Sequence, residues 1–181
     1  IQPPKIPKKK PQEYPPNKKA CRIRFRFAKT KPINLLSHLD IMRLIERALR
    51  RSQLPVSYSE GFHPLPRIKI ALALPLGVEA FGEWMEIDFF KEIDPKKVKD
   101  KLHEYLPQGI NIISAKITPV RKHTIHKELS TSVWSFQLKV ISGEHPSQHD
   151  WEEAINSLLK SKNLIWNDSD KKGRPRTRNC R

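Results

Sequence analysis

The sequence predicts an α+β fold with antiparallel sheets, because short strands with alternating apolar residues are interleaved with amphipathic helices. Residues 21–27 (CRIRFRF) alternate strictly between apolar side chains and arginines, which is the pattern of a half-buried strand. Ser37, followed by Asp40 three positions later, forms a capping box. The apolar residues after it recur at spacings of three and four, which predicts a helix to about Ser52.

Four further elements follow along the chain. Residues 67–74 and 83–90 alternate between apolar and polar side chains, as strands do. Residues 94–105 have the periodicity of a helix with an aspartate at its N-cap, and residues 111–117 form a last strand. The resulting order, β-α-β-β-α-β, is that of a ferredoxin-like unit.

The rest of the chain begins in the same way. Residues 133–141 alternate as a strand, with one face that carries Trp134, Phe136, Leu138 and Val140. Residues 148–161 are amphipathic with helical spacing, and two short strands follow near residues 164–166 and 175–178. This β-α-β-β order lacks a final helix and strand. We therefore predict a tandem of ferredoxin-like units, of which the second is truncated.

Composition divides the chain into four parts. Residues 1–20 hold six prolines and six lysines with little to bury, so we predict a disordered Pro/Lys-rich linker. Residues 21–117 are the first ferredoxin-like unit, and residues 118–131 are a polar connector. Residues 132–181 are the second, incomplete unit, which ends in a basic run.

Charge and cysteine content exclude several classes of protein. The 181 residues include 35 Lys and Arg against 19 Asp and Glu, a net charge of +16 that favours a polyanionic partner. Cys21 and Cys180 are too few for a disulfide framework, and the cysteine spacing fits neither zinc nor an iron–sulfur cluster. The sequence has neither a signal peptide nor an apolar span, so we expect a cytoplasmic protein.

The first strands provide a candidate nucleic-acid surface. In a ferredoxin-like unit both helices cover one face of the sheet and leave the other open. Alternation places five basic residues on that open face: Arg22, Arg24, Arg26, Arg67 and Lys69. Such a face can bind RNA, here mainly through its phosphates. Glu86 and Asp88 fall on the same face one strand away, so cross-strand ion pairs are the alternative.

Two other basic groups are candidates for the same role. The first helix carries four arginines on one face: Arg43, Arg47, Arg50 and Arg51. A solvated helix face is the alternative interpretation of this group. The run near the end of the chain interleaves basic residues with Gly, Pro and Thr in a predicted hairpin suited to backbone contacts: Lys171, Lys172, Arg174, Arg176 and Arg178.

Histidines suggest a second, catalytic hypothesis. His38 lies in the first turn of the first helix, where the helix dipole disfavours the imidazolium. A neutral His38 could act as a general base and His63 as an acid in metal-independent RNA cleavage. Ordinary packing or hydrogen bonding is the alternative. The pairs His123–His126 and His145–His149 have ligand-like spacing but no cysteine cluster beside them, so we expect no metal site.

Several motifs in the same order are similar to one family: residues 24–30 (RFRFAKT), 36–40 (LSHLD), 47–51 (RALRR), 54–55 (LP), 58–66 (YSEGFHPLP), 73–79 (ALPLGVE) and 172–176 (KGRPR). The chain resembles the uncharacterised radical-SAM-linked domain, which is found in bacteria fused behind a radical SAM enzyme or encoded beside one. This resemblance implies that residues 1–20 are a tether from an upstream catalytic domain. That domain, and not this chain, would hold the iron–sulfur cluster and S-adenosylmethionine.

Two functions from different classes follow. The first is a non-catalytic accessory domain that binds structured RNA, tRNA or rRNA, for a radical SAM partner in cis or in trans. The second is a docking module for the radical SAM enzyme or its peptide substrate, through a loop that contains Ser59, Gly61, Phe62, His63, Pro64 and Pro66. A rigid turn packed on its own sheet is the alternative interpretation of this loop. In neither case do we expect the chain to be an enzyme on its own.

Overall fold

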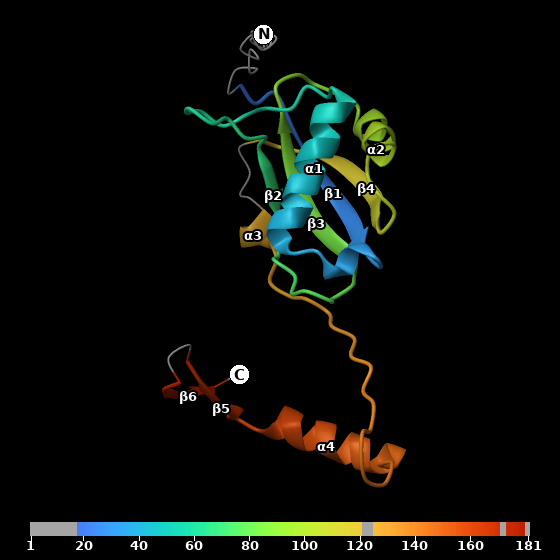
Figure 1. Ribbon diagram of the computed structural model, residues 1–181, viewed down its shortest axis with the longest axis vertical. Coiled ribbons are helices and arrows are strands. Elements are labelled where there is room, and N and C mark those ends of the chain that lie inside the picture. Colours follow the sequence, from blue (N-terminus) through green and yellow to red (C-terminus); the bar gives the residue numbers. More distant parts are fainter. Residues whose placement is uncertain (1–17, 121–124, 171–172, 180–181) are drawn as a thin grey trace, which may run out of the picture. The chain divides into compact units, whose positions relative to one another are not determined.

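The computed structural model describes residues 18–120, 125–170 and 173–179, and the chain divides into two compact units. Unit 1 extends from Ile1 to Ser132 and unit 2 from Val133 to Arg181. Each unit is described by itself (Figure 1). Most of the predicted linker, 1–17, and the candidate residues Lys171, Lys172 and His123 lie outside the described residues.

Unit 1 contains the predicted β-α-β-β-α-β order, with two short helical turns added. Its elements are β1 (Cys21–Lys29), a 3-10 turn (Ile33–Leu35), α1 (His38–Ser52), β2 (Ile68–Ile70), β3 (Ala80–Phe89), α2 (Pro95–His103), β4 (Ile110–Thr118) and α3 (Ile125–Glu128). The strands form one sheet in the order β2-β3-β1-β4, and every neighbouring pair is antiparallel. The predicted mixture of helices with antiparallel sheets is confirmed, and β1 and β3 occupy the centre of the sheet.

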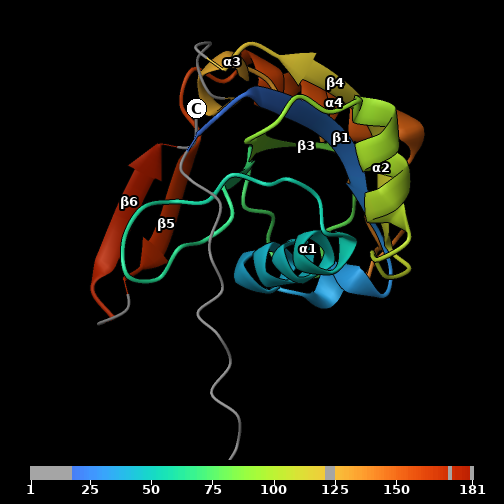
Figure 2. The same ribbon diagram turned by 90° about the horizontal axis from the view of Figure 1, so that it is seen from above.

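The core lies between this sheet and the helices α1 and α2, which cover the same face (Figures 1 and 2). The inward residues of β1, such as Phe25, pack there with Ile45 of α1, Ile87 of β3 and Leu102 of α2, all of them fully buried. Alternation along β1 therefore predicted the buried face correctly. Both predicted helix starts are also confirmed, because the side chains of Ser37 and Asp94 each accept a hydrogen bond from a backbone N–H of the first turn.

The second strand is shorter than predicted. Of residues 67–74 only Ile68–Ile70 form a strand, and Leu72, which belongs to the apolar set of the predicted alternation, is exposed. The reason is that the chain leaves β3 after the hydrogen bond from Ala71 N–H to the Trp84 carbonyl, and residues 71–79 form the connection to β3. Beyond that point β3 pairs with β1 alone.

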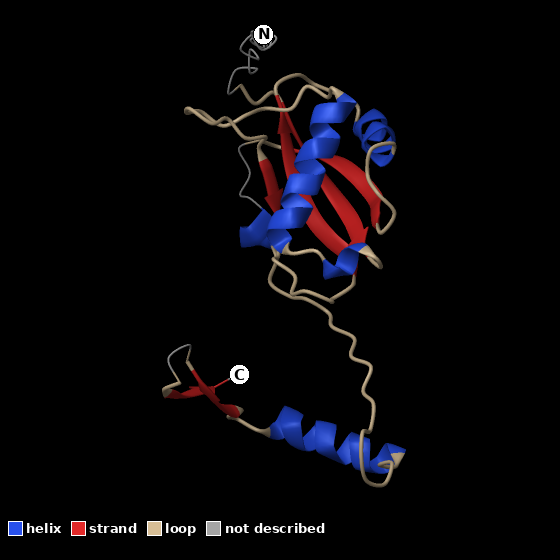
Figure 3. Cartoon of the chain, in the orientation of Figure 1, coloured by secondary structure: helices blue, strands red, loops and turns tan. Residues whose placement is uncertain are grey.

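Unit 2 contains only part of the predicted second copy. The helix α4 (Gln148–Lys160) forms with a capping box, and β5 (Ile165–Ser169) pairs with β6 (Pro175–Asn179) as a hairpin. The predicted strand at 133–141 is wrong, because these residues have no regular structure (Figure 3). A strand needs a neighbour for its backbone groups, and among the described residues β5 and β6 pair only with each other. The tandem ferredoxin-like arrangement is thus not confirmed.

The apolar side chains of unit 2 remain accessible. The stacked rings of Trp134 and Phe136, together with the apolar stripe of α4, are partly or largely exposed, and α4 buries none of its residues. Within the described part of the chain, the helices are too short or too polar to cross a bilayer.

Candidate nucleic-acid interface

The sheet face opposite α1 and α2 carries the arginines of β1, but the strand register places acids directly across from two of them. Arg22 pairs with Asp88 and Arg24 pairs with Glu86 across β1 and β3, while Arg26 lies opposite Trp84. Directly opposite residues on antiparallel strands share a face and lie within contact distance. The register therefore favours cross-strand ion pairs over a free basic surface.

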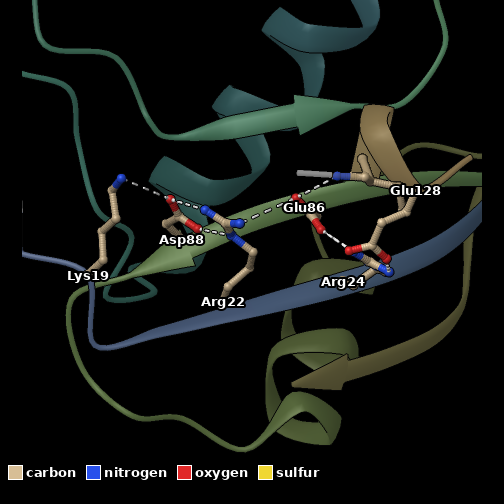
Figure 4. Close-up of polar contacts among 7 residues, drawn as sticks. Lys19, Arg22, Arg24, Glu86, Asp88 and Glu128 are labelled. Carbon is tan, nitrogen blue, oxygen red and sulfur yellow. Dashed lines mark hydrogen bonds and ion pairs between the residues drawn. The ribbon is translucent and has the colours of Figure 1, made fainter. Parts of the chain in front are cut away.

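The ion pairs form a network whose three central members, Arg22, Glu86 and Asp88, are all buried (Figure 4). The side chain of Arg22 is only 4% exposed; its Nε donates to Asp88 Oδ1 at 2.6 Å, and its Nη1 lies 3.8 Å from Glu86 Oε2. Lys19 Nζ lies 3.9 Å from the same Asp88 carboxylate. The hydrogen bond with Asp88 raises the pKa of Arg22 against the effect of burial, so the guanidinium stays charged.

Arg24 completes the network and joins it to α3. Its Nη2 donates to Glu86 Oε1 at 2.7 Å, and its Nη1 donates to Glu128 Oε2 at 2.8 Å. The hydrogen bond with Glu128 is the largest of the contributions that raise the pKa of Arg24. The guanidinium group of Arg24 is therefore neutralised within unit 1, by the carboxylates of Glu86 and Glu128.

The sheet face around Glu86 is also covered by another part of the chain. α3 lies on the opposite side of the sheet from α1 (Figure 2), Ile125 is only 1% exposed, and its backbone N–H lies 3.4 Å from Glu86 Oε2, to which it donates. Part of the predicted polar connector thus packs against the sheet face that we expected to be open. The buried Arg22 is not accessible to a polyanion, and Arg24 is accessible only in competition with Glu128.

The remaining sheet-face candidates are more accessible. Arg26 and Lys69 are exposed, whereas Arg67 is partly buried and its Nε donates to the Tyr58 carbonyl at 3.0 Å. Lys116 of β4 pairs in register with Arg24 and is exposed as well. Sequence reasoning missed Lys116, although its position in the alternation of β4 could have indicated it.

The four arginines of α1 share an exposed face, as predicted. Arg43 Nη1 lies 3.5 Å from Asp40 Oδ1, and Arg50 Nη2 lies 2.6 Å from Glu46 Oε1. Among the described residues no carboxylate forms an ion pair with Arg47 or Arg51. Exposed ion pairs contribute little free energy, so all four guanidinium groups remain available to an external anion.

The basic run near the end of the chain forms the predicted hairpin in part. Arg174 lies in the turn, and Arg176 and Arg178 belong to β6; all three are exposed. Arg178 Nη2 lies 3.1 Å from Asp168 Oδ2 of β5. These three arginines are a second accessible basic group, which belongs to unit 2.

His38 and His63 are not brought together. His38 lines a narrow cavity together with Lys29, the last residue of β1. The loop that contains His63 leaves the sheet beside Phe89, which pairs with Cys21, the first residue of β1. The two ends of a nine-residue strand are about 26 Å apart at about 3.3 Å per residue. The geometry does not support a general acid–base pair made of these two histidines.

The cavity beside His38 is lined by two ionisable groups that sequence reasoning missed, the buried Lys29 and the partly buried Glu83. Lys29 is 2% exposed and its Nζ donates to the Leu36 carbonyl at 3.2 Å. Burial lowers the pKa of Lys29 and raises the pKa of Glu83, which lines the same cavity. Lys29 continues the inward alternation of β1, and Glu83 continues that of β3. This alternation could have identified both residues from the sequence. The cavity volume, about 10 Å³, is that of a single water molecule.

No group of three or more His, Cys, Asp or Glu side chains that could hold a metal ion occurs in the described ranges, which leave out His123. His126, His145 and His149 are exposed.

The candidate docking loop forms a small hairpin of its own. Tyr58 and Pro66 form a β-bridge at its base, and the backbone and hydroxyl of Ser59 bond the backbone of Leu65. At the tip Gly61 has φ of +115°, a conformation that favours glycine, and Phe62 is fully exposed. His63 is exposed and Pro64 partly so, whereas Pro66 is buried.

We predict that Asp88→Asn lowers the free energy of unfolding of unit 1 by about 3 kcal/mol, because it leaves the buried Arg22 without its nearest countercharge. The matched control Glu46→Gln removes an exposed ion pair and should cost under about 1 kcal/mol. Amide hydrogen exchange of β1 and β3 measures both values. Equal losses in the two variants would show that the network is not a buried constraint.

We predict that Lys29→Met stabilises unit 1 by about 1 kcal/mol at neutral pH, because it removes a buried charge that forms no ion pair with any described carboxylate. The folded-state pKa of Lys29 lies below its usual value of 10.5, so the unfolded state binds more protons between the two values. Wild-type stability therefore rises with pH through that range, and the advantage of the variant shrinks. Hydrogen exchange at several pH values measures this change in stability, with the exposed Lys97→Met as the control. Equal changes in the two variants would contradict the prediction.

The chain matches one protein family over almost its whole length. Residues 22–181 fit a family described as an uncharacterized protein conserved in bacteria (DUF2344). A comparison with curated proteins finds no match. Since the fit covers far more than half of the residues, the chain belongs to this bacterial family.

Proposed function

We propose that this chain is a non-catalytic accessory part of a bacterial radical SAM protein of the cytoplasm and that it binds structured RNA, such as tRNA or rRNA. The observation that carries the RNA part is the exposed arginine face of α1, on which Arg47 and Arg51 have no acidic partner among the described residues. The motifs shared with the radical-SAM-linked domain support the radical SAM part. The cluster and S-adenosylmethionine belong to the partner domain in this proposal.

The fold part of the proposal is a ferredoxin-like unit in residues 21–118. Its support is the sheet order β2-β3-β1-β4 with two helices on one face, in which β3 lies between the parallel pair formed by β1 and β2. For the truncated second copy, the support is the order of α4, β5 and β6 alone.

The arrangement of the α1 arginines suits phosphate contacts. Arg43, Arg47 and Arg51 follow at intervals of four residues, so they form a line of about 12 Å along the helix at 1.5 Å per residue. Guanidinium groups bind phosphate oxygens through paired hydrogen bonds. Phosphate contacts fix the position of a nucleic acid without reading its sequence, which fits recognition of a folded RNA by its shape.

The sheet face has a smaller part in this proposal than the arginines of β1 suggested. Arg22 and Arg24 are neutralised by Asp88, Glu86 and Glu128. The exposed cations that remain near them are Arg26, Lys69 and Lys116. We therefore assign the main contact to α1 and a lesser one to these three side chains.

We predict that changing Arg43, Arg47 and Arg51 together to Gln weakens binding of the full chain to folded tRNA at least tenfold at physiological salt. Each lost phosphate contact also reduces the slope of log K against log salt by about 0.7 to 0.9. Filter binding at several salt concentrations measures both effects. The expected loss follows from the removal of guanidinium–phosphate contacts, since these exposed side chains contribute little to the fold.

The matched control changes the exposed Lys96, Lys97 and Lys101 of α2 to Gln, which removes the same charge from another helix of unit 1. Equal losses in the two triple variants would mean that net charge, and not the α1 face, determines binding. Absence of RNA binding by the unchanged chain would refute the proposed function itself.

A docking module is the second candidate function, and the fully exposed Phe62 at the tip of the hairpin loop favours it. Exposed aromatic rings are frequent centres of protein interfaces. We predict that Phe62→Ser lowers the affinity of the full chain for its radical SAM domain about tenfold or more, as measured by calorimetry. Phe81→Ser, which changes an exposed phenylalanine of β3, is the control. If Phe62→Ser has no effect, the loop is not the docking element.

A further inference from the structure

One face of the β5–β6 hairpin combines an aromatic ring with arginines. Trp166 lies directly opposite Arg178, and Asp168 lies directly opposite Arg176. Residues two apart on a strand point to the same side, and so do directly opposite residues of an antiparallel pair. All four side chains therefore share one face of the hairpin, with Trp166 60% exposed.

The other face of the hairpin carries side-chain hydrogen bonds beside the exposed Ile165. Thr177 Oγ1 lies 2.9 Å from Asn167 Oδ1, and the side-chain oxygen of Asn179 accepts from Leu164 N–H at 3.1 Å. The Asn179 amide nitrogen donates to Asn163 Oδ1 at 3.0 Å. These contacts stabilise a two-stranded ribbon that is otherwise short and present the opposite face, with Trp166 and the arginines, as a platform.

The charge on the platform is basic despite its one acid. Asp168 Oδ2 lies 3.1 Å from Arg178 Nη2, and the Arg178 side chain is still 48% exposed. Arg176 forms no ion pair with any described residue. An anion can therefore contact both guanidinium groups beside the indole ring, because an exposed ion pair such as Arg178–Asp168 contributes little.

We propose that this platform binds a single-stranded stretch of RNA, with a base stacked on Trp166 and the adjoining phosphates held by Arg176 and Arg178. Aromatic side chains next to cationic ones are the general means of binding unpaired nucleotides, since every base has a π-face and every linkage a charge. The α1 face differs in chemistry, because it offers arginines without a ring and so contacts phosphates alone. This inference rests on the proposed RNA-binding function and adds the class of RNA segment that unit 2 contacts.

The test measures binding of the full chain to a short oligouridylate and to inorganic polyphosphate, which has the charge but no bases. Trp166→Ala should weaken oligouridylate binding about tenfold by the same factor at every salt concentration, and leave polyphosphate binding unchanged. The double variant Arg176→Gln/Arg178→Gln should weaken both ligands and reduce the salt slope. Trp151→Ala, which changes an exposed tryptophan of α4, is the matched control and should leave both affinities unchanged.

The inference is overturned if Trp166→Ala leaves oligouridylate binding unchanged, if it weakens polyphosphate equally, or if Trp151→Ala has the same effect. A protein partner that covers Trp166 predicts the first of these results. Failure here is distinct from failure of the proposed function, because the triple α1 variant would still lose tRNA affinity. If the unchanged chain binds neither tRNA nor oligouridylate, both proposals are wrong.

Discussion

The pairing of Arg22 with Asp88 and of Arg24 with Glu86 across the central strands is the constraint on which unit 1 depends. A buried guanidinium without a countercharge destabilises a fold by several kcal/mol, so β1 and β3 must keep the register that brings these groups together. A slip by one residue would also turn the arginines of β1 into the core. Once paired, the charges can be buried, and α3 contacts the Arg24–Glu86 pair through the Ile125 N–H and Glu128.

This network changes what the charge of +16 means for binding. Arginines on a strand are available to a partner only if nothing inside the protein neutralises them, and Arg22 and Arg24 are neutralised. Most of the accessible arginines among the described residues instead lie on α1 and on the β5–β6 hairpin. At both places exposed ion pairs hold some arginines weakly, and Arg47, Arg51 and Arg176 have no acidic partner among the described residues.

Alternation and capping could predict unit 1 because they report on burial along a single element. They identified the inward face of β1, the helix starts at Ser37 and Asp94, and the acids that lie across from the arginines. They could not predict that α3 covers the sheet, since one buried residue, Ile125, has no periodicity. The strand expected at 133–141 failed for a related reason: alternation shows which side chains a strand would bury, but not whether a neighbouring strand exists to pair with it.

The two proposed contacts have complementary chemistry, and their combination has a physical advantage. Phosphate contacts on α1 weaken as salt rises, whereas stacking on Trp166 has no ionic component and does not. Because both contacts belong to one chain, binding at one raises the local concentration of the RNA at the other. A folded RNA with an unpaired end can then be bound firmly although each contact alone is modest. In this proposal an RNA with an unpaired end offers a ligand for each contact, whereas a plain duplex offers no unpaired base to Trp166. This difference is a basis for discrimination that needs no base-specific hydrogen bond.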